Sequence, residues 1–575
     1  MNNKSRWSAE ILLAFGALVL GSCSFSFVTN SASSSSQAPA SSTGDTASAT
    51  SEGGAASSSS GSSASSSGAA ASSGVSSTSA SSAPGDSSSS GSGNFYKVTG
   101  DTTTKALNYQ SINANQGIDA LPTTGSPKIL VLPIELTGYE FSSAALNDID
   151  TALNGANGTG YWESVASFYK KSSFGSFTPS YTLGTKYVSS LTPQQLYAKN
   201  TSSLPVSSYI LRQALANHKK VSGDNCTAYD SDKNGYVDAV IMVYSCPDVS
   251  KDSALSEIDS DYDVFWAFCF WDYSNPSSPS TASPIGMTYF WMSYNFLYEE
   301  STSPKPDAHT LIHESGHLMG ADDYYCYDTV TTDKSEYTPA PMGGVAMMDC
   351  NVTDHDAFTK LSFNWVKPYV VTGNATITIN PMETNGDCIL IPAKGSTWNG
   401  TAFDEYMLLE LYTPTGLNQL DSLAQYSYDP LGYTTAGIRL MHVDNRLAKC
   451  TYNSSNEISE TAYVTGTPSS LSATSDSDYE IPQSNTPSRR AGDAATKGYN
   501  LVTMIQAGYP TNTLQYGRNQ GDNKNLFTAG QSFDQATYSS FFANQTTLDN
   551  GSAFGYRIHF DKVSATSATI NFTTL

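Results

Sequence analysis

The sequence predicts an α+β domain that is followed by an all-β C-terminal region of one or two modules and preceded by a disordered Ser-rich tether. Almost every residue from 24 to 94 is Ser, Ala, Gly or Thr. Buried-strand and helical patterns mix up to about residue 370, and only short β-rich stretches separated by turn residues follow. We therefore divide the chain into an N-terminal signal segment (1–23), a linker (24–94), an N-terminal extension (95–125), an α+β domain (126–370) and a β-rich C-terminal region (371–575).

The N-terminus has the features of a signal peptide. Lys4 and Arg6 form a short basic start, and the apolar run from Ile11 to Leu20 is too short to span a bilayer comfortably. The run ends in Leu-Gly-Ser-Cys, which resembles a bacterial lipobox. We expect Cys23 to be diacylated and to become the first mature residue, so that the protein is an extracellular lipoprotein anchored to the bacterial cell membrane. The alternative is an ordinary signal peptide with an incidental cysteine.

The linker at 24–94 cannot bury enough apolar surface to offset its ordering entropy, so we expect it to be disordered. As a flexible coil of about 65 residues it would span about 45 Å. Such a tether would let the folded part stand away from the membrane.

The charge balance argues against a nucleic-acid partner. The formal net charge is -23, and binding a phosphate backbone requires Lys and Arg side chains that neutralise it. The composition instead suits a protein that works outside the cell.

Periodicity assigns the main elements of the folded part. In the α+β domain, apolar runs predict buried strands at Lys128–Leu136 and Val237–Tyr244, and amphipathic patterns predict helices at Tyr161–Lys171, Pro306–Met319 and Ala357–Val366. In the C-terminal region we expect strands at Ala375–Asn380, Cys388–Pro392, Tyr406–Tyr412, Gly437–Val443, Tyr556–Phe560 and Ala568–Phe572.

The second of these helices, Pro306–Met319, carries a metal-binding pattern, H-E-x-x-H. His313 and His317 are four residues apart, so both project from one helix face and can share a metal ion. A catalytic zinc site has three protein ligands and one position left for water. Glu314 lies beside the first ligand, where it can act as general base towards a zinc-activated water. The alternative is a solvated helix with two incidental histidines.

The third ligand is expected just after the helix. Gly320 would end the helix three residues after His317, and a turn there would bring Asp323 back towards the metal. The competitors are Asp322 and, in an arrangement that uses a later helix, Glu336. The whole pattern reads H-E-x-x-H-x-x-G-x-x-D, which is similar to the metzincin pattern with Asp in the place where many members have His.

A second segment, Gly343-Gly344-Val345-Ala346-Met347-Met348-Asp349, resembles a metzincin Met-turn, which places a methionine beneath the zinc ligands. Met348 is the better candidate and Met347 the alternative. Two adjacent methionines taken alone would more often fill a core.

Together these segments resemble the immune inhibitor A family of secreted bacterial zinc metallopeptidases. The resemblance rests on the strand LVLPIEL, the acidic loop before VDAVIMVY, HESGHLMGADDYY, GGVAMMD and WVKP, in that order. It covers about residues 126 to 370, and more loosely extends to Asp444. It implies a metzincin-like peptidase domain. Cys350 is a departure, because we would expect Tyr after the Met-turn Asp.

An acidic loop precedes the second predicted strand. Asp230, Asp232, Asn234 and Asp238 alternate as oxygen donors, and Gly235 allows a sharp turn, as in the first half of a calcium loop. The last-position Glu of an EF-hand is missing, because Ile241 stands there. The loop is therefore either a structural Ca²⁺ site or an Asx-rich turn without metal.

The sequence thus predicts a secreted, membrane-anchored hydrolase, a Zn²⁺-dependent metalloprotease that cleaves protein or peptide substrates. One alternative is a surface adhesin or binding protein that uses its C-terminal β modules, with a peptidase site that is inert or narrow in specificity. The presence of Glu314 argues against an inert site. A zinc hydrolase acting on a non-peptide bond is a further alternative.

Overall fold

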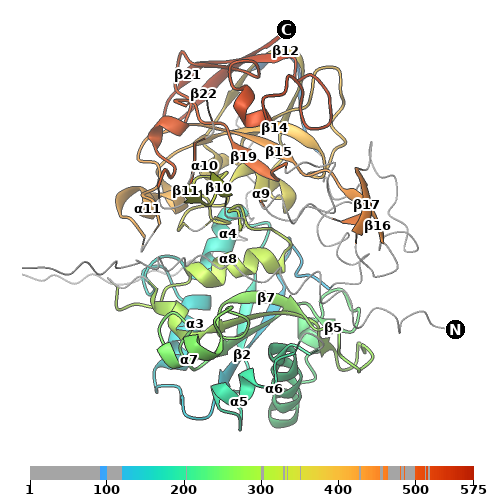
Figure 1. The fold of residues 1–575 in the computed structure, drawn as a ribbon, viewed down its shortest axis with the longest axis vertical. Coiled ribbons are helices and arrows are strands. Elements are labelled where there is room, and N and C mark those ends of the chain that lie inside the picture. Colours follow the sequence, from blue (N-terminus) through green and yellow to red (C-terminus); the bar gives the residue numbers. More distant parts are fainter. Residues whose placement is uncertain are drawn as a thin grey trace, which may run out of the picture. The chain divides into compact units, whose positions relative to one another are not determined.

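The computed structural model describes residues 91–99, 119–201, 204–299, 303–327, 330–332, 335–349, 351–426, 429–452, 458–463, 479–480, 485, 499–509, 511, 513–515 and 518–575. The predicted signal peptide, Cys23, the linker up to residue 90 and Cys350 lie outside this set. Within it, none of the helices combines the length and apolar character needed to cross a membrane. The fold has mixed α and β content with extensive sheets (Figure 1).

A six-stranded sheet organises the first half of the fold. Its order is β3–β2–β6–β9–β7, with β4 also paired to β2. Only β7 runs antiparallel to its neighbour. The strands are β2 (Lys128–Glu135), β3 (Ser180–Leu183), β4 (Tyr187–Val188), β6 (Val240–Tyr244), β7 (Phe268–Trp271) and β9 (Thr288–Ser293). Parallel strands that are covered on both faces need continuous apolar runs, and β2 and β6 have them.

Six α-helices accompany this sheet in the chain: α3 (Ala145–Asn154), α4 (Val165–Ser172), α5 (Pro193–Tyr197), α6 (Val206–Ser222), α7 (Ser253–Ile258) and α8 (His309–Leu318). Local signals set several of their ends. Ser164 forms a capping box with Ser167 at the start of α4, and Gly223 ends α6 with a φ of 75°. Helix α8 packs against β7 and β9 (Figure 1).

A nine-stranded sheet organises the C-terminal region. Its order is β19–β15–β14–β13–β12–β22–β21–β20, with β1 also paired to β12. All neighbours are antiparallel except β12 and β13. The strands are β1 (Gly91–Lys97), β12 (Tyr369–Ile379), β13 (Cys388–Ile391), β14 (Glu405–Tyr412), β15 (Gly437–Asp444), β19 (Val502–Met504), β20 (Ser532–Asp534), β21 (Tyr556–Val563) and β22 (Ala568–Thr574).

Short elements complete the described fold. The paired strands are β5 (Tyr236–Val237) with β8 (Ile285–Gly286), β10 (Val330–Thr332) with β11 (Ser335–Tyr337), and β16 (Ala448–Tyr452) with β17 (Ile458–Tyr463) and β18 (Tyr479–Glu480). The short helices are α9 (Ala357–Ser362), α10 (Met382–Asn385) and α11 (Gln419–Leu423).

Several predicted limits differ from the structure. The segment Val237–Tyr244 is split between β5 and β6, which belong to different sheets. The helix expected at Ala357–Val366 ends at Ser362, because Asn364 adopts a left-handed φ of 62°. Strand β1 begins at Gly91, so its first residues lie in the segment that the sequence assigned to the linker.

Buried polar contacts join the C-terminal region to α9 and to the segment before α8. Glu410 on β14 accepts a hydrogen bond of 2.7 Å from the backbone N–H of Ala357 at the start of α9, and it also pairs with Arg439 on β15. Tyr426 donates to Asp307, just before α8, at 2.6 Å. One cluster of buried apolar side chains includes residues from both regions. The C-terminal region therefore packs against α9 and against the chain that leads into α8, the helix that carries the candidate site.

Candidate metal centre

Helix α8 carries the residues of the predicted H-E-x-x-H pattern, and a buried hydrogen bond holds this helix against α4. His313 and Glu314 are buried, and the side chain of His317 is 17% exposed. The hydroxyl of Tyr169 donates to the carbonyl of Ile312 at 2.6 Å and so ties α4 to α8. The helix ends where the sequence predicts, because Gly320 adopts a φ of 102°.

Three atoms from this segment form a nearly equilateral triangle. Nε2 of His313 lies 3.1 Å from Nε2 of His317, and Oδ1 of Asp323 lies 3.0 and 3.3 Å from these two atoms. Ligands at about 2.0–2.1 Å from a tetrahedral zinc ion lie about 3.3–3.4 Å from one another. The two histidines and Asp323 thus fit three corners of a zinc tetrahedron.

Backbone carbonyls fix the orientation of both imidazole rings. Nδ1 of His313 faces the carbonyl of Met347 at 2.9 Å, and Nδ1 of His317 faces the carbonyl of Ala321 at 2.7 Å. A carbonyl oxygen only accepts, so Nδ1 carries the proton in each neutral ring and Nε2 presents a lone pair. When both rings are neutral, the two Nε2 lone pairs and the carboxylate repel one another, and a shared cation, either a metal ion or a proton held by His317, removes that repulsion. This arrangement is the usual one around metal-binding histidines.

The charges within the triangle are strongly coupled. Burial alone would raise the pKa of Asp323, but the two imidazoles lower this pKa well below its usual range. Burial would also lower the pKa of His317, yet the Asp323 carboxylate raises this pKa to about 10. The hydroxyl of Tyr327 donates to Oδ2 of Asp323, so the second carboxylate oxygen points away from the histidines. No local sequence pattern marks Tyr327 as part of the site.

Glu314 lies next to the triangle with a carboxylate oxygen available. One of its oxygens lies within 4.8 Å of the nearest ring nitrogens of both histidines. The side chain is buried, and its Oε2 has no hydrogen-bond partner among the described residues. Burial raises the pKa of Glu314 above its ordinary value, while the histidines oppose the rise. On the edge strand β7, the thiol of Cys269 donates to the backbone carbonyl of Glu314 at 3.1 Å.

Met348 lies beneath the candidate ligands, as the Met-turn pattern predicts. A Cβ atom added to Gly316, between the two histidines, would lie 2.7 Å from the Met348 sulfur. The Met348 side chain is fully buried. The neighbouring Met347 contributes its carbonyl to His313. Both methionines therefore contact the segment that carries the candidate ligands: Met348 packs its side chain under Gly316, and Met347 contacts His313 through its backbone carbonyl.

The two other candidates for the third ligand, Asp322 and Glu336, lie at different places from Asp323. The carboxylate that contacts both histidines is that of Asp323. Asp322 is half-buried beside it. Glu336 lies on β11, a strand, where it pairs with Thr331, and not on a later helix as the rival arrangement requires. The placement of the Glu336 side chain lies outside the described residues.

The acidic loop forms a second cluster. Carboxylate oxygens of Asp230, Asp232 and Asp238 lie within 4.8 Å of one another. Asn234 differs from the prediction, because its side-chain amide donates to the acids instead of offering oxygen, at 2.8 Å to Asp119 and 2.9 Å to Asp232. Asp119 was not predicted from the sequence. It lies 115 residues before Asn234 in the chain, and no local pattern marks it.

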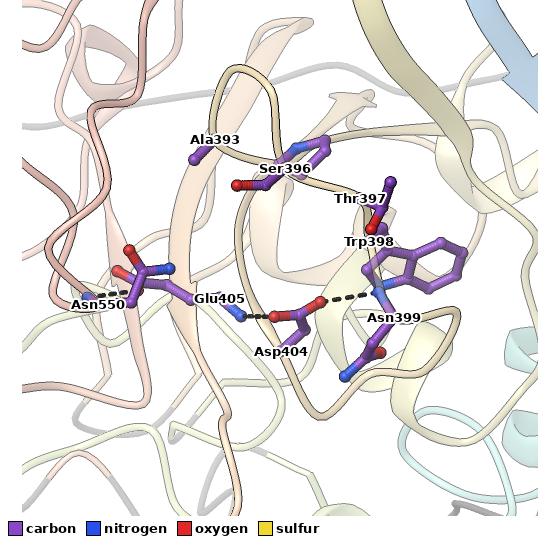
Figure 2. A pocket seen from close by; sticks show the side chains of 9 residues that line it. Ala393, Ser396, Thr397, Trp398, Asn399, Asp404, Glu405 and Asn550 are labelled. Atoms are coloured by element: carbon purple, nitrogen blue, oxygen red, sulfur yellow. Dashed lines mark hydrogen bonds between the residues drawn. The ribbon is translucent and has the colours of Figure 1, made fainter. Parts of the chain in front are cut away.

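A third polar cluster borders a cavity of about 230 Å³ in the C-terminal region (Figure 2). Figure 2 shows Glu405, Asp404, Trp398 and Asn550 around this cavity. The Glu405 carboxylate accepts hydrogen bonds of 2.6 and 2.8 Å from the backbone of Asp549 and Asn550, and one of 2.9 Å from His442. Because both oxygens are engaged in this way, we interpret the cluster as a clamp between a loop and strands β14 and β15.

Comparison with known proteins adds no assignment, because no family model matches the chain and no curated protein matches it.

Proposed function

We propose that this protein is a zinc-dependent endopeptidase that hydrolyses peptide bonds in proteins. The observation that carries the proposal is the triangle formed by His313 Nε2, His317 Nε2 and Asp323 Oδ1, with the Glu314 carboxylate beside it. The donor set, two neutral imidazoles and one carboxylate, suits zinc and leaves one tetrahedral position for water.

The residues of this chain have distinct tasks in the proposed reaction. Bound zinc supplies Lewis-acid activation of a water molecule and of the scissile carbonyl. Glu314 accepts the proton of the attacking water at its carboxylate and then delivers it to the leaving amine. The carbonyls of Met347 and Ala321 hold both imidazole rings in the tautomer that leaves Nε2 available. Tyr327 holds Asp323 so that a single oxygen faces the histidines.

The metzincin-like assignment is part of the proposal. It is supported by the turn at Gly320, which returns Asp323 to the two histidines, and by the Met348 side chain packed under Gly316. The resemblance to the immune inhibitor A family rests on the same segments. An antiparallel edge strand, β7, borders the site through Cys269. Such an edge offers backbone groups to which an extended peptide can bind.

The proposed setting is outside the bacterial cell. Diacylation of Cys23 would anchor the enzyme to the membrane, the Ser-rich linker would extend it from the surface, and its partners would be protein or peptide substrates. Metabolic labelling with a radioactive fatty acid tests this part of the proposal. The parent chain should incorporate the label and Cys23→Ser should not. Equal labelling of both chains would contradict the anchor.

Metal removal and return test the enzymatic part. The full chain should contain one equivalent of zinc and should cleave a reduced, unfolded protein. Chelation should abolish cleavage, and added zinc should restore it. A zinc-loaded chain that cleaves no protein would count against the proposal and in favour of the binding-protein alternative.

A further inference from the structure

Four carboxylates converge at the acidic loop without a compensating cation from the protein. Asp230, Asp232 and Asp238 come from the loop itself. Asp119 comes from the segment before β2, and Asn234 joins it to the loop. No Lys or Arg in the part of the chain that the structure describes forms an ion pair with any of the four.

Two of these carboxylates are buried with an oxygen that lacks a partner. Asp119 is 9% exposed and Asp238 is 3% exposed. Oδ2 of each has no hydrogen-bond partner among the described residues. An unpaired buried carboxylate oxygen is costly, and a buried charge is usually paired or bound to a metal ion. This pair of oxygens therefore indicates a cation-binding site more directly than the clustering of acids does.

The four carboxylates lie together with no Lys or Arg paired to any of them among the described residues. Their negative charges repel one another, and a bound cation would relieve this repulsion.

We propose that Asp119, Asp230, Asp232 and Asp238 bind one structural Ca²⁺ ion, and that this ion fastens the segment at Asp119, which contacts the end of the candidate zinc helix, to the acidic loop. Oxygen ligands alone suit a hard cation, and calcium accepts the irregular geometry of mixed carboxylates. The loop is already shaped for this task. Gly235 has a φ of 93°, and a Cβ there would lie 2.6 Å from the backbone nitrogen of Ser280.

Hydrogen bonds connect the cluster to helix α8. Two residues after Asp119, the backbone N–H of Leu121 donates to the carbonyl of Leu318 at 3.0 Å. Leu318 directly follows His317. The carbonyl of Thr123 accepts a bond of 2.6 Å from the indole of Trp365. Calcium binding at Asp119 would therefore restrain the chain that supports the C-terminal end of α8.

Terbium luminescence measures occupancy of the site directly. Tyr236 borders the cluster, since its backbone N–H donates to Asn234 Oδ1 at 2.8 Å, and it should sensitise bound Tb³⁺. We expect Ca²⁺ to displace Tb³⁺ from the zinc-loaded full chain. Asp119→Asn and Asp238→Asn should each weaken Ca²⁺ binding at least tenfold. Glu140→Gln, which removes an exposed acid elsewhere, should bind Ca²⁺ like the parent. A parent that binds no Ca²⁺, or Asp→Asn variants that bind it as well as the parent, would overturn the proposal.

Thermal unfolding separates a binding role from a purely structural one. Each Asp→Asn variant lacks one of four repelling carboxylates, so without Ca²⁺ it should unfold at the same temperature as the parent or higher. With Ca²⁺ the parent should gain stability and the variants should gain less. A variant that unfolds earlier than the parent both with and without Ca²⁺ would contradict the proposal.

Hydrogen exchange tests the connection to α8. Ca²⁺ should slow exchange of the Leu121 amide in the parent but not in Asp119→Asn. Slower exchange confined to residues 230–238 would show that the loop binds calcium without Asp119, and would overturn that ligand assignment. None of these measurements depends on peptidase activity, so failure of the calcium site and failure of the proposed function are distinguishable.

Discussion

Nε2 of His313 lies 3.1 Å from Nε2 of His317, although the Nδ1 atoms of both rings face backbone carbonyls. When both imidazoles are neutral they present lone pairs to each other, and Asp323 adds a carboxylate oxygen to the same space. Such an arrangement favours a cation at its centre, and the raised pKa of His317 has the same cause.

Asp323→Asn should weaken zinc binding by at least about tenfold, because it replaces an anionic ligand by a neutral one and disturbs the partner of Tyr327. Competition with a chromophoric zinc chelator measures this change. Asp322→Asn is the matched control, since it removes the neighbouring carboxylate and should leave the zinc affinity as in the parent. A reversal of the two results would make Asp322 the third ligand.

Tyr327→Phe should lower the zinc affinity by about 10–100-fold, as is typical when a group that orients a ligand is removed. The change deletes the hydroxyl that donates to Asp323 Oδ2 and keeps the ring. The same chelator competition measures it, and circular dichroism checks that the fold is retained. An unchanged zinc affinity would show that Asp323 is held adequately without Tyr327.

Met348→Ala should destabilise the protein by about 2–5 kcal/mol, because it leaves a cavity beneath Gly316 in a fully buried region. Met348→Leu keeps most of the volume and should cost less than about 1.5 kcal/mol. Denaturant unfolding of the zinc-loaded chains measures both values. Equal losses from the two substitutions would show that the sulfur itself, and not the packing, is required.

His442 should make stability depend on pH. Burial alone lowers its pKa, but the bond to Glu405 and the charges of Asp549 and Asp444 raise this pKa above the ordinary value of about 6.5. The folded protein then holds a proton that the unfolded chain releases, so the stabilisation is complete below about pH 6.5 and is lost as the pH rises through the folded pKa.

His442→Gln, which keeps a hydrogen-bonding side chain but cannot ionise, should flatten this part of the profile. The parent should lose up to about 1.4 kcal/mol per pH unit more than the variant in the same window. Urea unfolding from pH 6 to pH 9 measures the difference. Parallel profiles would contradict a charged His442 in the folded protein.

The structure brings together the residues that local sequence signals single out as candidate zinc ligands. The spacing of His313 and His317 is a property of one helix, and Gly320 ends that helix by adopting a positive φ, so Asp323 could be expected from a few neighbouring residues. The C-terminal end of α8 followed for the same reason, but its predicted start was wrong, because the helix begins at His309 and not at Pro306.

Contacts between segments that are far apart in the chain could not be predicted from local sequence patterns. Asp119 reaches the acidic loop across 115 residues, and the pairing of β1 with β12 joins segments that are further apart still. Asn234 carries a suitable oxygen for a calcium loop, yet in the structure that oxygen accepts the Tyr236 amide and the NH₂ group faces the acids. A periodic pattern records which residue types recur, but it does not record how a side-chain amide is turned.

The most direct test of the account compares hydrolysis of an unfolded protein by the full parent chain and by Glu314→Gln, with zinc content measured in both. Glu314 is the proposed proton acceptor and not a ligand, so zinc should stay bound in the variant. Hydrolysis should fall by about 10²–10⁴-fold, the usual contribution of a general base. Equal hydrolysis by the two chains at equal zinc content would contradict the proposed mechanism.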